Sequence, residues 1–195
     1  LYRWEESGAT SALLSYAKNV GQNGDLKTMD RICKLVMSKC KDKLTVQNKT
    51  EALETYVGFH GIDAMNVLLK AVANSDKTYR NAALRASLAI PDKEIVNKWI
   101  QYFPKALPEA KPEIITMLGE RGDESALPLI TTSLSNNDPK VRTEAAAALA
   151  KVSGKKAITS LIEYLKNSAG QSDQEAAKTA LMTVSGNNEI ALLKP

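Results

Sequence analysis

A set of turn residues recurs along the chain at nearly constant spacing, and this recurrence constrains the fold more than any other feature. Gly61, Pro91, Gly122, Gly154 and Gly186 are separated by 30, 31, 32 and 32 residues. The segments between these turns contain apolar residues spaced by three and four, which is the period of an α-helix. The sequence therefore predicts a repeated unit of about 31 residues that contains two helices.

Each unit is expected to be a pair of antiparallel helices. The clearest one covers residues 124–152, where Asp138 is a favourable N-cap and Pro139 a favourable first helical residue. Gly154 suits the left-handed conformation that often follows a helix. Pairs are predicted at about 26–58, 62–90, 93–120, 124–152 and 156–184, after an N-terminal helix at about 8–22 and before a truncated next repeat at 187–195. We interpret residues 1–195 as a single repeat domain, a fragment of a longer protein.

Basic residues also follow the repeat. Lys49, Arg80, Lys111 and Arg142 recur at intervals of 31 residues in the second helices, and Gln174 takes this position in the last pair. Three residues beyond the first four positions lie Ala52, Ala83, Ile114 and Ala145. Such a coincidence of several series in one register supports the repeat assignment.

Two segments resemble HEAT repeats. One runs from Leu118 to Asp123 and continues with Ala126 to Ile130, and the other runs from Asp138 to Arg142 and continues with Ala145, Ala148 and Leu149. The resemblance is closest to the short bacterial HEAT-like repeats first noted in phycobilin lyases, and it is strongest over residues 110–186. It implies an all-α fold, a right-handed α-α superhelix (solenoid) of about five helix pairs plus the N-terminal helix. It also implies a structural ladder that pairs Asp76 with Arg80 and Asp138 with Arg142.

In this family the second helix of each pair lines the concave side, which implies a candidate protein-binding surface. Positions one and five residues after the basic series are expected there: Thr50, Glu54, Asn81, Arg85, Pro112, Thr116, Thr143 and Ala147. These residues share no sign of charge, whereas a nucleic-acid groove would repeat Lys or Arg. A protein segment is therefore the favoured partner.

Catalytic motifs are missing from the sequence. His60 is the single histidine, and no phosphate loop, dinucleotide fingerprint or zinc-protease motif occurs. No catalytic, cofactor-binding or metal-binding residue is predicted, and His60 is interpreted as a turn residue without Cys or carboxylate neighbours at ligand spacing. We expect a non-enzymatic scaffold or interaction module, an accessory domain of a larger protein. Its partner would be another protein or a neighbouring domain of the same chain.

Two other functions stay open. The net charge of +4, together with basic residues clustered at 27–49, fits a HEAT-like nucleic-acid-binding or base-excision protein. A chromophore-lyase-like activity follows only from the resemblance. A salt series of DNA binding and a tetrapyrrole titration would distinguish these two alternatives from the scaffold.

Three side-chain expectations complete the sequence picture. Cys33 and Cys40 are predicted to be buried and, at about 10 Å along one helix, too far apart for a disulfide. Trp99 is expected in the core. The apolar run 190–193 predicts an exposed end that favours self-association. No apolar run is long enough to span a membrane, and the cytoplasm and export within a larger protein both remain possible compartments.

Overall fold

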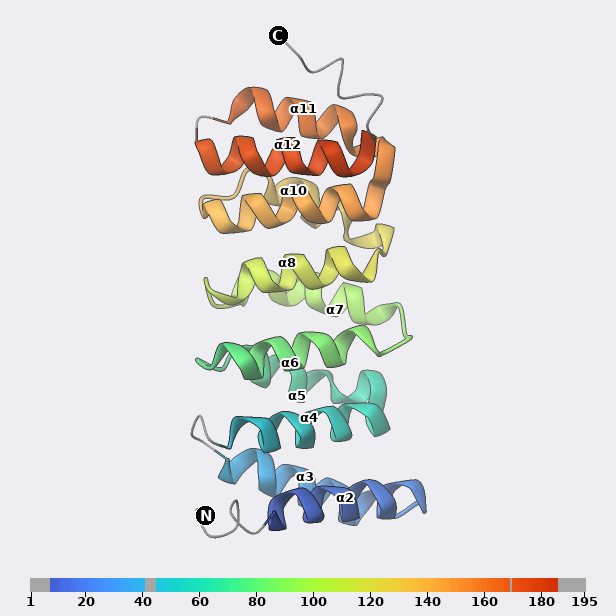
Figure 1. The fold of residues 1–195 in the computed structure, drawn as a ribbon. Coiled ribbons are helices and arrows are strands. Elements are labelled where there is room, and N and C mark those ends of the chain that lie inside the picture. Colours follow the sequence, from blue (N-terminus) through green and yellow to red (C-terminus); the bar gives the residue numbers. More distant parts are fainter. Residues whose placement is uncertain (1–7, 41–44, 169, 186–195) are drawn as a thin grey trace. The chain divides into compact units, whose positions relative to one another are not determined.

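The computed structural model describes residues 8–40, 45–168 and 170–185, and helices are the regular elements it forms there (Figure 1). No strand occurs in these described residues. The predicted all-α fold of helix pairs is confirmed. The chain divides into two compact units, Leu1–Ile95 and Val96–Pro195, and each is described by itself. The assignment of 1–195 to one repeat domain stays a prediction.

Helices of unit 1 pack in a layered order. The elements are α2 (Ala9–Gln22), α3 (Leu26–Lys39), α4 (Val46–His60), the 3-10 turn η1 (Gly61–Ala64), α5 (Met65–Val72) and α6 (Lys77–Leu88). Helix α4 packs against α3 and α6, α2 packs against α3 and α4, and α5 packs against α6. The core between α2, α3 and α4 is apolar and includes Leu14, Met29, Ile32 and Cys33.

Short polar residues fix where the unit 1 helices begin. The Asp25 carboxylate accepts a hydrogen bond from the Thr28 backbone N–H at 3.0 Å, and Asp76 accepts one from the Tyr79 N–H at 3.1 Å. Each carboxylate satisfies a donor that has no partner within its helix. These N-caps separate successive helices without long loops.

Unit 2 repeats the same design. It contains most of α7 (Glu94–Tyr102), then η2 (Phe103–Lys105), α8 (Ala110–Arg121), η3 (Glu124–Ala126), α9 (Leu127–Ser133), α10 (Pro139–Ser153), η4 (Gly154–Ala157), α11 (Ile158–Asn167) and α12 (Gln171–Ser185). Helix α10 is central and packs against α8, α9 and α12, while α11 packs against α12. Trp99 is fully buried, as the register predicts.

The predicted helix boundaries agree with the structure to within a few residues, with one systematic difference. Three of the predicted first helices, at 62, 124 and 156, open with a 3-10 turn before the α-helix begins. Gly122 and Gly154 end α8 and α10 with φ of 71° and 52°, a region in which a side chain would be strained. The glycines of the recurring turns therefore have a backbone role.

Cys33 and Cys40 are both buried and both are free thiols, so these predictions are confirmed. Burial raises the pKa of the Cys33 thiol to about 11. The apolar run 190–193, the truncated repeat at 187–195 and the turn at Gly186 lie outside the described residues. Self-association through that end stays a prediction.

Candidate protein-binding surfaces

Four of the residues predicted for the binding surface lie on α4 and α6 in unit 1: Thr50, Glu54, Asn81 and Arg85. The structure brings Glu54 and Arg85 together, with 3.7 Å between Arg85 Nη2 and Glu54 Oε1. Both side chains remain accessible, at 65% for Arg85 and 46% for Glu54. An ion pair this exposed contributes little to stability, so both groups can exchange it for a partner's charges.

A mostly apolar groove lies beside this ion pair. Its volume is about 350 Å³, and it is lined by Glu54, Val57, Gly58, Gly61, Arg85, Ala86, Ala89, Ile90 and Pro91. Gly58 lies within α4, and a Cβ added there would meet no atom within 4 Å. The missing side chain thus leaves the groove open at that point.

The same helices carry further charge of both signs. Lys18 Nζ on α2 lies 2.9 Å from Glu51 Oε1 on α4. Two acidic residues of α4 are therefore each paired with a basic residue of a neighbouring helix, Lys18 on α2 and Arg85 on α6. These paired charges give the surface no overall sign.

The corresponding residues of unit 2 lie on α8 and α10. Thr116 Oγ1 is 2.8 Å from Glu144 Oε2 and 3.0 Å from the Pro112 carbonyl oxygen, while Thr143 Oγ1 donates to the Lys140 carbonyl at 3.1 Å. Ala147 is exposed. Thr116 thus links α8 to α10, while Thr143 is held against its own helix, and a role for them in binding stays a prediction.

The predicted pairing of Asp138 with Arg142 is wrong. Arg142 instead reaches forward to the next helix pair, where its Nη2 lies 2.6 Å from Asp173 Oδ2 and its Nε 3.1 Å from Asp173 Oδ1. The Asp138 carboxylate accepts from the Lys140 N–H at 2.9 Å. The physical reason is that a carboxylate at the N-cap points at the free N–H groups of its own helix.

The contacts of Asp76 and Arg80 follow the same rule. Asp76 caps α6, and Arg80 Nη1 donates to the carbonyl oxygens of Asn74 at 3.0 Å and Ser75 at 2.9 Å. In these hydrogen bonds Asp76 and Arg80 each bind backbone groups and do not bind each other. Arg80 is buried, with 4% of its surface exposed.

Gln174 takes the place of the arginine in the last pair, as the register predicts. Its Nε2 donates to the Ser168 carbonyl at 3.0 Å, and Arg142 Nη1 donates to the Asn136 carbonyl at 2.9 Å. In these cases, and for Arg80 with Asn74, the acceptor precedes the donor by six residues. Arg80, Arg142 and Gln174 therefore each hold the loop between the two helices of their pair through a hydrogen bond to its backbone.

Asp173 is the centre of a polar network in unit 2. Besides Arg142, it accepts a hydrogen bond from the Tyr164 hydroxyl at 2.7 Å. The Arg142 guanidinium, followed by the Tyr164 hydroxyl, holds the pKa of the Asp173 carboxyl below its usual value despite burial. Burial and the adjacent carboxylate raise the pKa of Tyr164.

A polar cavity of about 660 Å³ lies over this network. Asparagines and hydroxyl side chains from the α9–α10 loop, α11 and the α11–α12 loop line it, among them Asn136, Asn137, Ser160 and Asn167. Among the described residues that line it, Arg142 is the one cation, and it already pairs with Asp173. This described lining therefore offers no unpaired positive charge to an anionic ligand.

His60 has no Cys or carboxylate at ligand spacing in the sequence, but the fold brings Asp30 into contact with it. His60 is the last residue of α4, and its Nε2 lies 2.5 Å from Asp30 Oδ1 on α3. Lys34 Nζ binds the other oxygen of Asp30 at 2.9 Å, and the Tyr56 ring lies 4.4 Å from the His60 ring. Asp30 and His60 are 30 residues apart. That near-repeat spacing is the one signal in the sequence that could have indicated their contact.

No group of three or more potential metal ligands occurs in the described part of the chain. Across the same residues, none of the helices combines the length and apolar character needed to cross a bilayer.

Comparison with known proteins identifies the repeat. Residues 96–182 match the family model for HEAT repeats. No curated protein matches the chain significantly. The matched region begins one residue after the boundary between the two units and ends within α12. Taken with the helix pairs and their clamped loops, the match shows that residues 96–182 of this chain are HEAT repeats.

Proposed function

We propose that this chain is a protein-interaction module whose α4–α6 groove holds a short apolar segment of a partner. HEAT repeats are generally protein-interaction scaffolds. The observation that carries the proposal is the groove of about 350 Å³ beside the exposed Glu54–Arg85 pair. Apolar walls supply binding energy, and the charged rim orients the bound segment.

The composition of the groove suggests the partner's chemistry. Val57, Ala86 and Ile90 favour an apolar side chain between the helices. Glu54 and Arg85 at the edge favour a base and an acid on either side of it. The partner is either a separate protein or a neighbouring domain of a larger chain that this module serves.

The alternative functions have weaker support. Among the basic residues, Arg142 is neutralised by Asp173 and Lys34 by Asp30. Glu54, the acid that a base-excision role would use, lies beside Arg85. The lyase-like alternative rests on resemblance alone.

Filling the groove tests the proposal. Gly58→Leu places an apolar side chain in the open space, and the helical backbone at this position accepts it. Gln47→Leu is the control, since Gln47 is an exposed residue of the same helix outside the groove. Proteins captured by the unmodified chain are expected to bind Gln47→Leu equally and to be lost with Gly58→Leu.

A captured protein is then purified and titrated calorimetrically. Gly58→Leu should weaken its binding at least tenfold, and the charge swap Glu54→Arg with Arg85→Glu should also weaken it. If Gly58→Leu binds every captured protein as tightly as Gln47→Leu does, the groove is not the binding site.

A further inference from the structure

Helix α3 exposes apolar side chains that it does not use for packing. Its inner side buries Met29, Ile32, Cys33 and Val36 in the core of unit 1. Away from this buried side Leu26 is 40% exposed and Leu35 is 48% exposed, but their separation of nine residues places them on opposite flanks of the helix. Two of the five large apolar side chains exposed in the described residues thus belong to this one helix.

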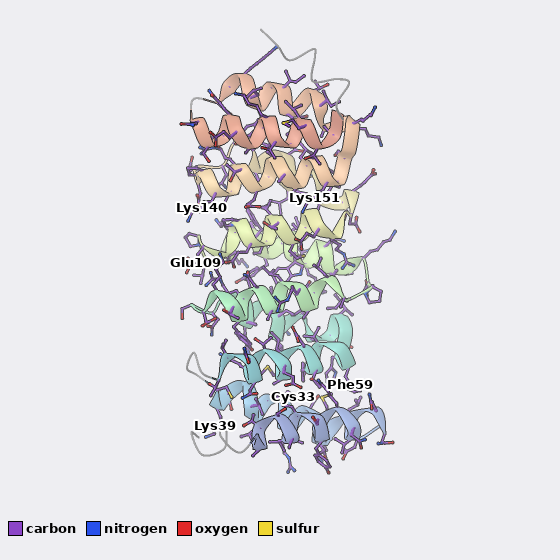
Figure 2. The ribbon with its side chains drawn as sticks, viewed as in Figure 1. Cys33, Lys39, Phe59, Glu109, Lys140 and Lys151 are labelled. Carbon is purple, nitrogen blue, oxygen red and sulfur yellow. The ribbon has the colours of Figure 1, made fainter. Side chains whose placement is uncertain are left out.

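The exposed side of α3 is also positively charged. Lys27, Arg31 and Lys39 are exposed and form no ion pair with another described residue. Figure 2 shows Lys39 at the end of α3. Of the acids nearby, Asp30 is held by His60 and Lys34. Asp25 caps the helix, and the hydrogen bonds of this cap, followed by the nearby charges of Lys27 and Arg31, lower the pKa of its carboxyl. Nothing acidic on α3 itself is left to neutralise the three cations.

The spacing of these residues suits an elongated partner. Lys27, Arg31 and Leu35 follow one another at intervals of four residues, so they form one stripe along the helix. From Lys27 to Lys39 the stripe is about 18 Å long at the helical rise per residue. A partner matching it needs acidic groups over about three helical turns, with an apolar residue opposite Leu35.

We propose that this surface, the α3 face formed by Lys27, Arg31, Leu35 and Lys39, docks an acidic segment of a partner protein that carries an apolar residue opposite Leu35. Charge complementarity accelerates and orients the encounter, and burial of Leu35 holds the complex. The α3 face and the α4–α6 groove share no residue. An experiment can therefore disprove binding at one site without affecting the other.

Other polyanions fit the α3 face less well. Single-stranded nucleic acid is held by stacking on exposed aromatic rings, and the four residues of the α3 face include none. Duplex binding needs phosphate contacts but gains nothing from an exposed leucine. A membrane surface would recruit a broader apolar face than Leu35 provides.

The test uses a blocked synthetic peptide of 14 residues that repeats Glu-Leu-Glu-Glu-Leu-Glu-Glu, labelled with fluorescein. A second peptide with Ser in place of each Leu separates the apolar contribution from the charge. Fluorescence anisotropy measures binding to the unmodified chain and to two variants of equal net charge. These are Lys27→Glu with Arg31→Glu, and the control Lys70→Glu with Lys77→Glu on exposed positions of α5 and α6.

The Leu-containing peptide is expected to bind at least tenfold more weakly to the Lys27→Glu, Arg31→Glu variant than to the control. Leu35→Ser should weaken it about threefold or more, and the Ser peptide should not distinguish Leu35→Ser from the unmodified chain. Circular dichroism should show equal helix content in all variants. Equal peptide affinity for the two charge variants overturns the proposal, as does tighter binding to phosphatidylserine vesicles or duplex DNA than to the peptide.

Discussion

Asp173 is a buried carboxylate at a position of the repeat that carries apolar side chains in three of the other four pairs. Counted from the basic series, its equivalents are Tyr79, Ala110 and Val141, all buried, and the half-buried Asn48. Only 5% of its surface is exposed, and both of its oxygens accept hydrogen bonds. A buried charge is tolerated when it is paired and fully hydrogen-bonded. Asp173 therefore links α10 to α12 through Arg142.

Asp173→Asn should lower the free energy of unfolding by about 2–3 kcal/mol at pH 7. This is at or below the cost of breaking a fully buried ion pair, because Arg142 keeps some contact with solvent. The pKa of Asp173 is lowered from 3.8 in the folded state, so its contribution is full above about pH 4 and is lost as the pH falls through the lowered pKa. Urea unfolding at pH 7 and at pH 2.5 measures this. Equal urea midpoints for the variant and the unmodified chain at pH 7 would contradict this prediction. A difference between the two midpoints that is as large at pH 2.5 as at pH 7 would also contradict it.

The partner of Arg142 could not be predicted from the sequence. Asp138 is four residues away, whereas Asp173 is 31 residues away and belongs to the next helix pair. Choosing between them requires the stacking geometry of neighbouring pairs. By contrast, the sequence did show that Gln174 occupies the position of the basic residue in the last pair, because counting along the repeat is enough to locate that position.

At the scale of helices, α8 and α10 approach closely at Gly119. A Cβ added to Gly119 would lie 2.6 Å from the Ala148 Cβ and 2.8 Å from its Cα. The helices must separate to admit a methyl group, because the clashing atoms include backbone. Gly119 is thus required by packing, whereas Gly58 on α4 faces open space.

Gly119→Ala and Gly58→Ala should therefore change stability in opposite directions. Alanine favours a helix over glycine by about 1 kcal/mol, and Gly58→Ala should raise the free energy of unfolding by about 0.5–1 kcal/mol. Gly119→Ala should lower it by about 1–3 kcal/mol, since overpacking outweighs that preference. Urea denaturation of the two variants measures both values. A stabilised Gly119→Ala would show that α8 and α10 are not this close.

Helix boundaries could be predicted because caps, prolines and glycines are local signals. The 3-10 turns at η1, η3 and η4 were missed, since they depend on how each first helix enters the stack. The groove was missed as well: Glu54 and Arg85 were predicted for one surface, but its depth depends on Gly58 and on how α4 packs on α6.

At the scale of the whole molecule, stability depends on contacts between neighbouring helix pairs. Leu149 on α10 is 4% exposed, and α10 packs against α8, α9 and α12. Leu149→Ala should cost about 2–4 kcal/mol. Lys151→Ala, at the exposed end of the same helix (Figure 2), should change stability by less than about 0.5 kcal/mol. Similar urea midpoints for the two variants would show that the register is wrong.

The architecture could be predicted because the same pattern of apolar and turn residues occurs in several successive repeats. The sequence could predict only a broad class of function, that of a protein-interaction module. The residues that bind a partner depend on the surface of that partner, which this sequence does not contain. The mixed charge of Glu54 and Arg85 excluded a uniformly basic groove but did not identify the ligand.

Hydrogen exchange with a captured partner bound tests the central claim most directly. Amides at the C-terminal end of α4, from Glu54 to Gly61, and from Arg85 to Pro91 after α6 line the groove. We expect exchange to slow in both segments when the partner binds, while the α11–α12 loop around Ser168 keeps its rate. Protection confined to other segments, with 54–61 and 85–91 unchanged, would contradict the assignment of this groove as the protein-binding site.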